Sequence, residues 1–185
     1  QAFYSVLNSN TDASVSITDK FEINSAGTLT IDESATFASA GNDFNHNNGT
    51  IINNGTFEIN GDEIFTPSNF TIPGNTRVVG SVLSISTLDS LDNVEFNPSN
   101  GLLTLAIDID YIFGNFTLAE GDSFYMDIYD LTLADGGTVT NNGTWLAPSP
   151  GSEFRCLGNA SFLGEDMNFY KFRAELPDND TIIFK

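Results

Sequence analysis

The residue types that most often carry out enzymatic chemistry are scarce in this chain of 185 residues. It contains one histidine, His46, and one cysteine, Cys156, which excludes an internal disulfide, a thiolate metal cluster and a histidine-rich zinc site. His46 lies among asparagines in the turn-rich stretch 44–48, so we interpret it as a surface-loop residue and not as a catalytic base. Cys156 has apolar neighbours in Phe154 and Leu157, which favours a small buried side chain over an intermolecular disulfide.

Carboxylates are the abundant reactive groups, and four of them form the candidate metal site. Asp108 and Asp110 alternate on one face of a predicted strand, and Asp127 and Asp130 lie on a later run. Calcium takes six to eight oxygen ligands from carboxylates, amides and carbonyls, so calcium is the cofactor that this pattern favours. A solvated acidic face without bound metal is the interpretation that we prefer, because the chain has no EF-hand loop.

A polysaccharide-cleaving enzyme is one alternative function. A lyase would need a basic residue to remove a proton beside a carboxylate, and a hydrolase would need two carboxylates across a cleft. Basic residues are few, Arg77 is isolated in the sequence, and no acidic pair lies beside a histidine or a basic motif. We therefore expect that the protein is not an enzyme.

A glycan-binding module is a second alternative. Tyrosine and tryptophan combine a flat apolar body with a polar tip, and such side chains can form an exposed platform for sugar rings. Trp145, Tyr125 and Tyr129 are the candidate platform, and Tyr111 is a further member. Under this alternative the partner is a surface glycan.

The charge balance limits the partners further. The chain has 25 acidic and 6 basic residues, so its formal net charge is −19 at pH 7. Six scattered cations cannot form a phosphate-binding stripe, which argues against nucleic acid as a partner. No apolar run approaches the ~18 residues of a transmembrane helix, so membrane insertion is not expected. Apolar residues still make up 40% of the chain, which is enough material for a packed core.

Short alternating runs between turn signals predict an all-β fold. Asn-Gly dipeptides, which tolerate positive φ, punctuate the chain at five places. In the run 103–110 every second residue is apolar, and a period of two is typical of a half-buried strand. The segment 87–94 is the one stretch that we interpret as a short helix or a loop.

Internal repeats refine this prediction to a solenoid. Segments 29–37, 70–78 and 116–124 share an apolar-Thr-apolar opening, and their offsets of 41 and 46 residues fit two coils of about 20 residues each. Because one coil cannot bury its apolar face alone, stacked coils must cover one another. We therefore predict a parallel β-helix, right-handed and irregular, in which Phe70 and Phe116 hold matching inward positions. An antiparallel β-sandwich or jelly roll is the alternative fold.

The style of the repeats resembles that of a known group of proteins. The string 27–37, the Asn-Asn-Gly-Thr turns at 47–50, 53–56 and 141–144, and the string 70–76 carry the likeness. They look like the repeats of bacterial secreted β-helix surface proteins, which include passenger-type adhesins and haemagglutinin-like repeat proteins.

This resemblance spans roughly residues 14–146. It implies a right-handed β-helix, secretion, and adhesive or structural work at the cell surface. We accordingly expect a β-solenoid over residues 1–146, with a strand-like N-terminal segment. Residues 147–185 depart from the pattern and are expected to form a C-terminal cap, or strands of the same domain that pair with another subunit.

Both ends of the chain are strand-like and apolar, which predicts self-association. A stack of coils ends in two edges with unpaired N–H and C=O groups, and such edges are templates for another chain. We expect copies of the protein to pair head to tail through these edges and to form an extracellular or cell-surface filament, sheath or adhesin. The residues expected in this contact are Phe3, Tyr4, Val6, Leu7, Ile182, Ile183 and Phe184.

Positive charge gathers near the C-terminus. Arg155, Lys171 and Arg173 lie in the last 31 residues, whereas the rest of the chain is acidic. A head-to-tail contact between copies could use this asymmetry.

Seven Asn-x-Ser/Thr sequons are candidate glycosylation sites. Asn-Gly-Thr is also a signal for a turn followed by a strand, so a purely structural role is the alternative. The sequon asparagines are Asn48, Asn54, Asn69, Asn115, Asn142, Asn159 and Asn179.

Calcium should stabilise the protein if it neutralises the acidic face. We expect millimolar calcium to raise the melting temperature, because a net charge of −19 repels itself and the ion would bind near Asp108 and Asp110. Thermal unfolding followed by circular dichroism, with calcium and with chelator at one ionic strength, measures the effect. Identical melting curves in the two conditions would contradict the prediction.

Overall fold

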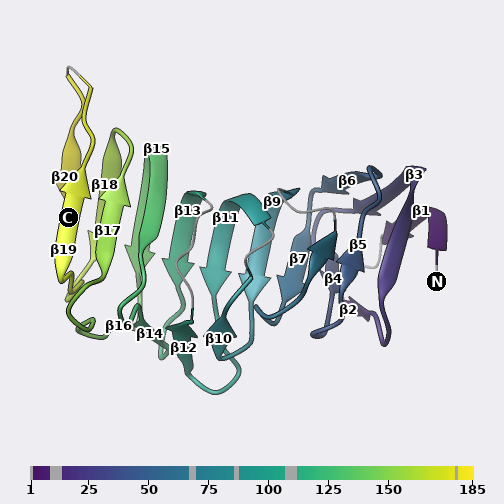
Figure 1. Cartoon of the computed structure of the whole chain (residues 1–185), viewed down its shortest axis with the longest axis horizontal. Helices are drawn as coiled ribbons and strands as arrows, with labels where there is room; N and C mark the ends of the chain where they lie inside the picture. Colours follow the sequence, from purple (N-terminus) through teal and green to yellow (C-terminus); the bar gives the residue numbers. More distant parts are fainter. Residues whose placement is uncertain (1, 9–13, 67–69, 86–87, 107–111, 178) are drawn as a thin grey trace.

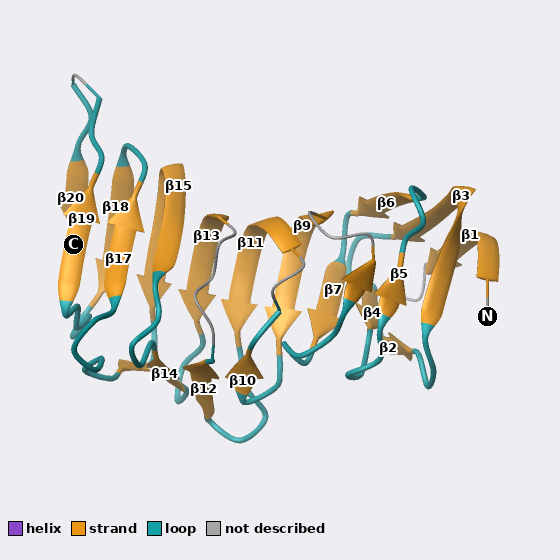
Figure 2. Ribbon diagram, viewed as in Figure 1, coloured by secondary structure: helices purple, strands orange, loops and turns teal. Residues whose placement is uncertain are grey.

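Parallel β-strands make up all of the regular secondary structure in the part of the chain that the structure describes. The computed structural model describes residues 2–8, 14–66, 70–85, 88–106, 112–177 and 179–185. Figure 2 shows strands and loops in these ranges and no helix. Accordingly, no helix in the described ranges is long and apolar enough to cross a membrane.

One long sheet runs along the longest axis of the molecule, and the two ends of the chain lie at opposite ends of that axis (Figure 1). Within the described ranges, its main path in spatial order is β19 (Lys171–Ala174), β17 (Glu153–Cys156), β15 (Leu131–Asn141), β13 (Ile112–Leu118), β11 (Leu88–Phe96), β9 (Phe70–Val78), β7 (Thr56–Ile59), β4 (Thr36–Ala38) and β2 (Ser14–Ser16). Beside this path, β18 (Ala160–Gly164) pairs with β15, and β20 (Ile182–Phe184) pairs with β18.

Two smaller sheets contribute the other strands of the coils. The first contains β1 (Ala2–Asn8), β3 (Phe21–Ile31), β5 (Phe44–Asn45) and β8 (Phe65–Thr66), with β6 (Thr50–Asn53) also paired to β3. The second contains β10 (Val82–Leu83), β12 (Leu102–Leu105), β14 (Ser123–Tyr125) and β16 (Thr144–Trp145).

The pairing of adjacent strands fixes the length of each coil. Asn75, Asn93 and Asn115 lie opposite one another on β9, β11 and β13, so successive coils here contain 18 and 22 residues. The strand pairs are parallel, which a β-sandwich of hairpins would not give. The predicted all-β parallel solenoid with coils of about 20 residues is therefore confirmed, and the antiparallel alternative is wrong.

A column of inward side chains runs along the long sheet, and we call it the core ladder. Alternation along each strand turns its member inward, where it stacks on the members in the coils on either side. In axial order the members are Val15, Phe37, Phe57, Thr76, Val94, Phe116, Val139, Phe162 and Phe184. Every member between the first and the last is buried, so each coil is covered by its neighbours.

The long strands bend at corners that interrupt the alternation. β3 and β15 share one pattern of buried and half-buried positions, broken by two exposed residues in the middle. In β15 these are Asp135 and Gly136, and Gly136 has a φ of 76°. A Cβ on the next residue, Gly137, would lie 2.5 Å from the carbonyl oxygen of Gly114 in the preceding coil, so the close approach of the coils requires glycine there.

The corners explain why the predicted repeat alignment is wrong in register. Phe116 is buried as expected, but pairing joins it through Val94 to Thr76. Phe70 lies opposite Leu88, on the other arm of its strand. The alignment matched the first arm of β9 with the second arm of β13, because both arms carry the same apolar alternation.

A corner also explains why the segment 87–94 resembles a helix in the sequence. Its described part belongs to β11, so the predicted helix or loop is wrong. Leu91 and Val94 are buried, and the exposed corner residues Asp92 and Asn93 lie between them. The corner therefore produces a spacing of three between apolar residues, which mimics one face of a helix.

The C-terminal region 147–185 adds parallel strands to the end of the long sheet. β17 pairs with the first arm of β15, and β18 pairs with the second arm. β19 and β20 then repeat this arrangement on β17 and β18. The last strands therefore stack on the preceding coils in the same way as the other strands of the long sheet.

Truncation in the middle of the core ladder should be far more costly than truncation at its end. Phe116→Ala is expected to lower the free energy of unfolding by about 3–5 kcal/mol, because it removes a buried ring and leaves a cavity. Phe184→Ala is the matched control on the same ladder, and its loss should be much smaller because Phe184 is exposed. Urea unfolding measures both, and equal losses would contradict the assignment of the ladder.

Candidate functional site

The C-terminal end of the solenoid is an unpaired edge with an aromatic surface. Among the described strands, β19 pairs only with β17 and β20 pairs only with β18. We call the three rings of the last coil, Phe169, Phe172 and Phe184, the end plate. The ring centroids of Phe169 and Phe172 are 5.3 Å apart, and those of Phe172 and Phe184 are 6.0 Å apart. The end plate rests on Phe154 and Phe162 of the preceding coil.

Exposure along the core ladder changes abruptly at this end. Phe162 is 1% exposed, and Phe184 stacks on it with ring centroids 4.9 Å apart. Phe184 continues the same column but is 62% exposed. A recess of about 340 Å³ lies beside it and is also lined by Met167 and Lys185. The last coil thus exposes a side chain whose counterparts in the other coils form the interior.

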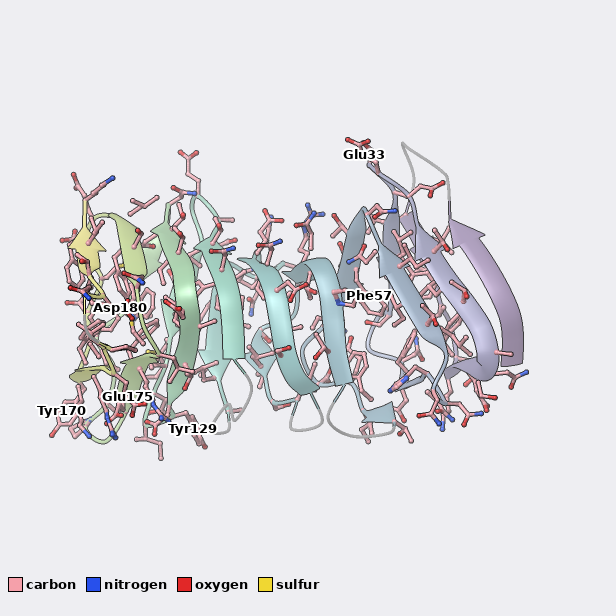
Figure 3. The ribbon with its side chains drawn as sticks, turned by 90° about the horizontal axis from the view of Figure 1, so that it is seen from above. Glu33, Phe57, Tyr129, Tyr170, Glu175 and Asp180 are labelled. Atoms are coloured by element: carbon pink, nitrogen blue, oxygen red, sulfur yellow. The ribbon has the colours of Figure 1, made fainter. Side chains whose placement is uncertain are left out.

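Ion pairs cover the outer face of the same coils. Arg173 pairs with Glu153 at 3.8 Å and with Glu175 at 2.9 Å. Lys171 also pairs with Glu153. Arg155 donates a hydrogen bond of 2.9 Å to Glu175, and this bond holds the pKa of the Glu175 carboxyl below its usual value. Figure 3 shows Glu175 at this end, where three cations meet two carboxylates.

The N-terminal end is an edge as well. Within the described part of the chain, β1 pairs only with β3, and β2 pairs only with β4. Val15, the first member of the core ladder, is 39% exposed. The backbone of Phe3, Tyr4, Val6 and Leu7 forms part of β1, and their side chains lie outside the described structure.

The structure places the other predicted contact residues at the opposite edge. Ile182, Ile183 and Phe184 form β20. Ile182 packs partly against the core, whereas Ile183 occupies an outward position and is 39% exposed. Sequence reasoning missed Phe169 and Phe172 of the end plate. The available signal was the run 169–173, which consists only of aromatic and basic residues.

A shallow groove of about 330 Å³ crosses the outer face of the long sheet. Asn75, Asn93 and Asn115 stack in adjacent coils and line it, together with Glu95. Asn115 Nδ2 donates to Asn93 Oδ1 at 2.8 Å, and Asn115 Oδ1 accepts from the Thr138 N–H at 2.8 Å. The groove presents amides and hydroxyls, which can donate and accept hydrogen bonds with a polyhydroxylated ligand. Its asparagine column was not singled out in the sequence, because the coil length varies along it.

Charges beside this groove are partly compensated. Arg77, which is isolated in the sequence, bridges two neighbouring coils: its Nε lies 2.7 Å from Glu95 and its guanidinium 3.8 Å from Glu58. Asp122 is buried near Glu95, and its Oδ2 has no hydrogen-bond partner among the described residues. Burial raises the pKa of the Asp122 carboxyl, and the negative charge of Glu95 raises it further.

The predicted aromatic platform is wrong for Trp145. Its side chain is 1% exposed and packs edge-on against Phe124, with ring centroids 5.0 Å apart. The alternation of β16 turns it inward, which the sequence pattern did not reveal. Tyr125 is half-buried with its hydroxyl 2.6 Å from Ser149 Oγ, and Tyr129 packs partly against the core. Tyr111 lies outside the described residues.

The described residues do not assemble the candidate calcium ligands into a cluster. Asp108 and Asp110 lie outside them. Asp127 Oδ1 accepts from the Tyr125 hydroxyl at 3.2 Å, and Asp130 Oδ1 accepts from a backbone N–H of β17 at 2.7 Å. No group of three or more acidic, histidine or cysteine side chains in the described ranges could hold a metal ion. Calcium binding stays a prediction.

The single histidine and the single cysteine are both buried. For His46 the predicted surface-loop position is wrong, because the alternation of β5 continues past its last residue and turns His46 inward like Phe44. The backbone N–H of His46 donates to the Thr66 carbonyl at 2.9 Å. Cys156 is buried as predicted, and burial raises the pKa of its thiol to about 12, so no thiolate forms at neutral pH.

The sequon asparagines within the described ranges are exposed. They are Asn48, Asn54, Asn115, Asn142, Asn159 and Asn179, and Asn69 lies outside those ranges. Asn159 Nδ2 donates to Asp180 Oδ1 at 2.8 Å, so this amide links two neighbouring coils. Glycosylation stays a prediction.

Comparison of the chain with protein-family models, with curated proteins and with solved structures finds no match.

Removal of the buried charge at Asp122 should stabilise the protein at neutral pH. The raised pKa means that ionised Asp122 destabilises the folded state, and this penalty is lost as the pH falls through the folded-state pKa toward 3.8. Asp122→Asn should therefore raise the melting temperature at pH 7 and change it little at pH 3. Asp166→Asn, at an exposed carboxylate, is the control and should have little effect at either pH. An equal gain for Asp122→Asn at both pH values would contradict this origin.

Proposed function

We propose that the protein is a structural subunit of an extracellular filament, sheath or adhesin, and that copies associate through the ends of the solenoid. The observation that carries the proposal is the end of the core ladder, where exposure rises from 1% at Phe162 to 62% at Phe184. An exposed ring of this size loses apolar contact with water when another strand covers it, which favours association.

The backbone supports the same contact. Each edge strand has pairing groups on the side away from its neighbour, and an added strand can satisfy them by β-augmentation. The two edges lie at opposite ends of the long axis (Figure 1). A contact between unlike ends does not close on itself, so repetition produces a filament.

The remaining surface favours a structural role over catalysis. The outward column next to the core ladder consists largely of Ser, Thr and Asn, among them Thr56, Asn93 and Thr138, and these side chains stack between coils. The extracellular location rests on the resemblance of the repeats to those of secreted surface proteins. A polysaccharide-cleaving activity has less support, because Glu95 at the groove is paired with Arg77.

Glycan binding is the second candidate function, and the groove of the long sheet is the observation that favours it. Asn75, Asn93 and Asn115 repeat along the groove at the spacing of adjacent strands, about 4.8 Å, and offer hydrogen-bonding groups to a sugar chain. The buried Trp145 cannot contribute a stacking surface.

Self-association should depend on the apolar end of the core ladder. The particle mass of the full chain, measured by light scattering at physiological salt, should rise with protein concentration, and electron microscopy should show elongated particles. Phe184→Glu should suppress this growth, because it places a charge on the surface to be buried. Its monomer should remain folded, since residue 184 is 62% exposed.

Ile128→Glu provides the matched control. Ile128 is 51% exposed and lies between β14 and β15, and on the long sheet β17 separates β15 from the last strand, β19. This variant should associate like the parent protein. A parent protein that stays monomeric at high concentration would overturn the proposal and favour the glycan-binding alternative, and equal loss in both variants would assign the association to non-specific apolar contact.

A further inference from the structure

We propose that the occupant of the C-terminal edge is the N-terminal edge of a second copy, with β20 of one copy pairing in parallel with β2 of the next and Phe184 stacking on Val15. This inference rests on the proposed self-association and specifies its partner and register. It follows from the core ladder, the alternation of backbone hydrogen bonds, and the distribution of charge along the chain.

The register follows from the two ends of the same column. Phe184 is the last member of the core ladder and Val15 is the first, and both are partly exposed. If coaxial stacking continues the ladder, Phe184 of one copy lies opposite Val15 of the next. Ile183 then lies opposite Ser14, and these two residues are the ends of the neighbouring outward column.

The backbone groups at the two edges match this register. Lys185 donates to the Phe162 carbonyl and accepts from the Gly164 N–H, so odd-numbered residues of this strand point to β18. Alternation directs the N–H and C=O of Phe184 to the open side. At the other edge, Ile17 donates to a carbonyl of β4, so Ser14 and Ser16 point away from it. In a parallel pair, Phe184 would donate to the carbonyl of Ser14 and accept from the N–H of Ser16.

The charge distribution disfavours contact between two N-terminal ends. Residues 1–66 contain nine acidic residues and one lysine, for a net charge of −8. Residues 151–185 contain six acidic and four basic residues, for a net charge of −2. Two N-terminal ends would therefore repel strongly, whereas the C-terminal end, with Lys171 and Arg173 exposed, meets the acidic end with less repulsion.

Engineered disulfides test the register directly. The double variant Ser14→Cys with Ile183→Cys places two outward side chains on adjacent strands about 4.8 Å apart, which is within the Cα separation that a disulfide allows. Mild oxidation should convert it into a ladder of covalent multimers in a non-reducing gel. Ser16→Cys with Lys185→Cys should behave in the same way, because it is the next pair in this register. Cys156 is buried and stays outside the reaction.

The controls separate the register from the association itself. Ser16→Cys with Ile183→Cys shifts the pair by two residues, to about 8 Å, and should give little crosslinking. Each single variant should give none. Crosslinking of Ile183→Cys alone would show contact between like ends and overturn the inference.

A second outcome would also overturn the register while leaving the proposed function intact. In that outcome, light scattering shows growth of the particles, but neither in-register pair crosslinks above the shifted pair. If the particle mass does not rise with concentration and no pair crosslinks, both the register and the proposed self-association are overturned. The end plate would then be a surface for a partner other than a second copy.

Discussion

The structure depends on one constraint, which is that a single β-coil cannot cover its own apolar side chains. Alternation turns every second residue inward, and the inner face of one coil is too thin to exclude water. Burial is complete only where the next coil stacks in register, as the core ladder shows between Phe37 and Phe162. The parallel pairing, the coil length and the glycine at the corner of β15 all serve this stacking. The same constraint leaves the two terminal coils incompletely covered, and this exposure supports the proposed association through the ends of the solenoid.

The general fold could be predicted from the sequence because alternation and coil length are local or nearly local properties. The errors arise because the sequence does not show where the alternation of a short strand begins and ends. His46 is buried because it continues the alternation of β5 past the end of that strand, and Trp145 is buried because it holds an inward position within the two-residue strand β16. Leu91 and Val94 have helical spacing because a corner adds two exposed residues between them. Of the candidate site, the apolar terminal strands were predictable, whereas the end plate depends on which aromatic rings stack across coils.

Ion pairs between neighbouring coils compensate part of the negative charge locally, although the net charge of the chain is −19. Arg77 lies between Glu58 and Glu95 on consecutive coils, so one cation reduces repulsion along an outward column. Arg155, Lys171 and Arg173 do the same at the C-terminal end with Glu153 and Glu175. Exposed pairs of this kind contribute little to stability individually. They also lower the density of negative charge at the C-terminal edge, where the proposed contact forms.

The composition of the core ladder also has a mechanical meaning. Between Phe57 and Phe116 the column carries Thr76 and Val94, and the buried hydroxyl of Thr76 has no hydrogen-bond partner among the described residues. In a solenoid, stability is close to a sum of nearest-neighbour contacts, so small side chains contribute less to this layer of the ladder than stacked rings contribute to the aromatic layers. The backbone compensates here, because β9 and β11 pair along both of their arms. A pull along the axis would therefore be resisted mainly by strand pairing at this layer and also by stacked rings on either side of it.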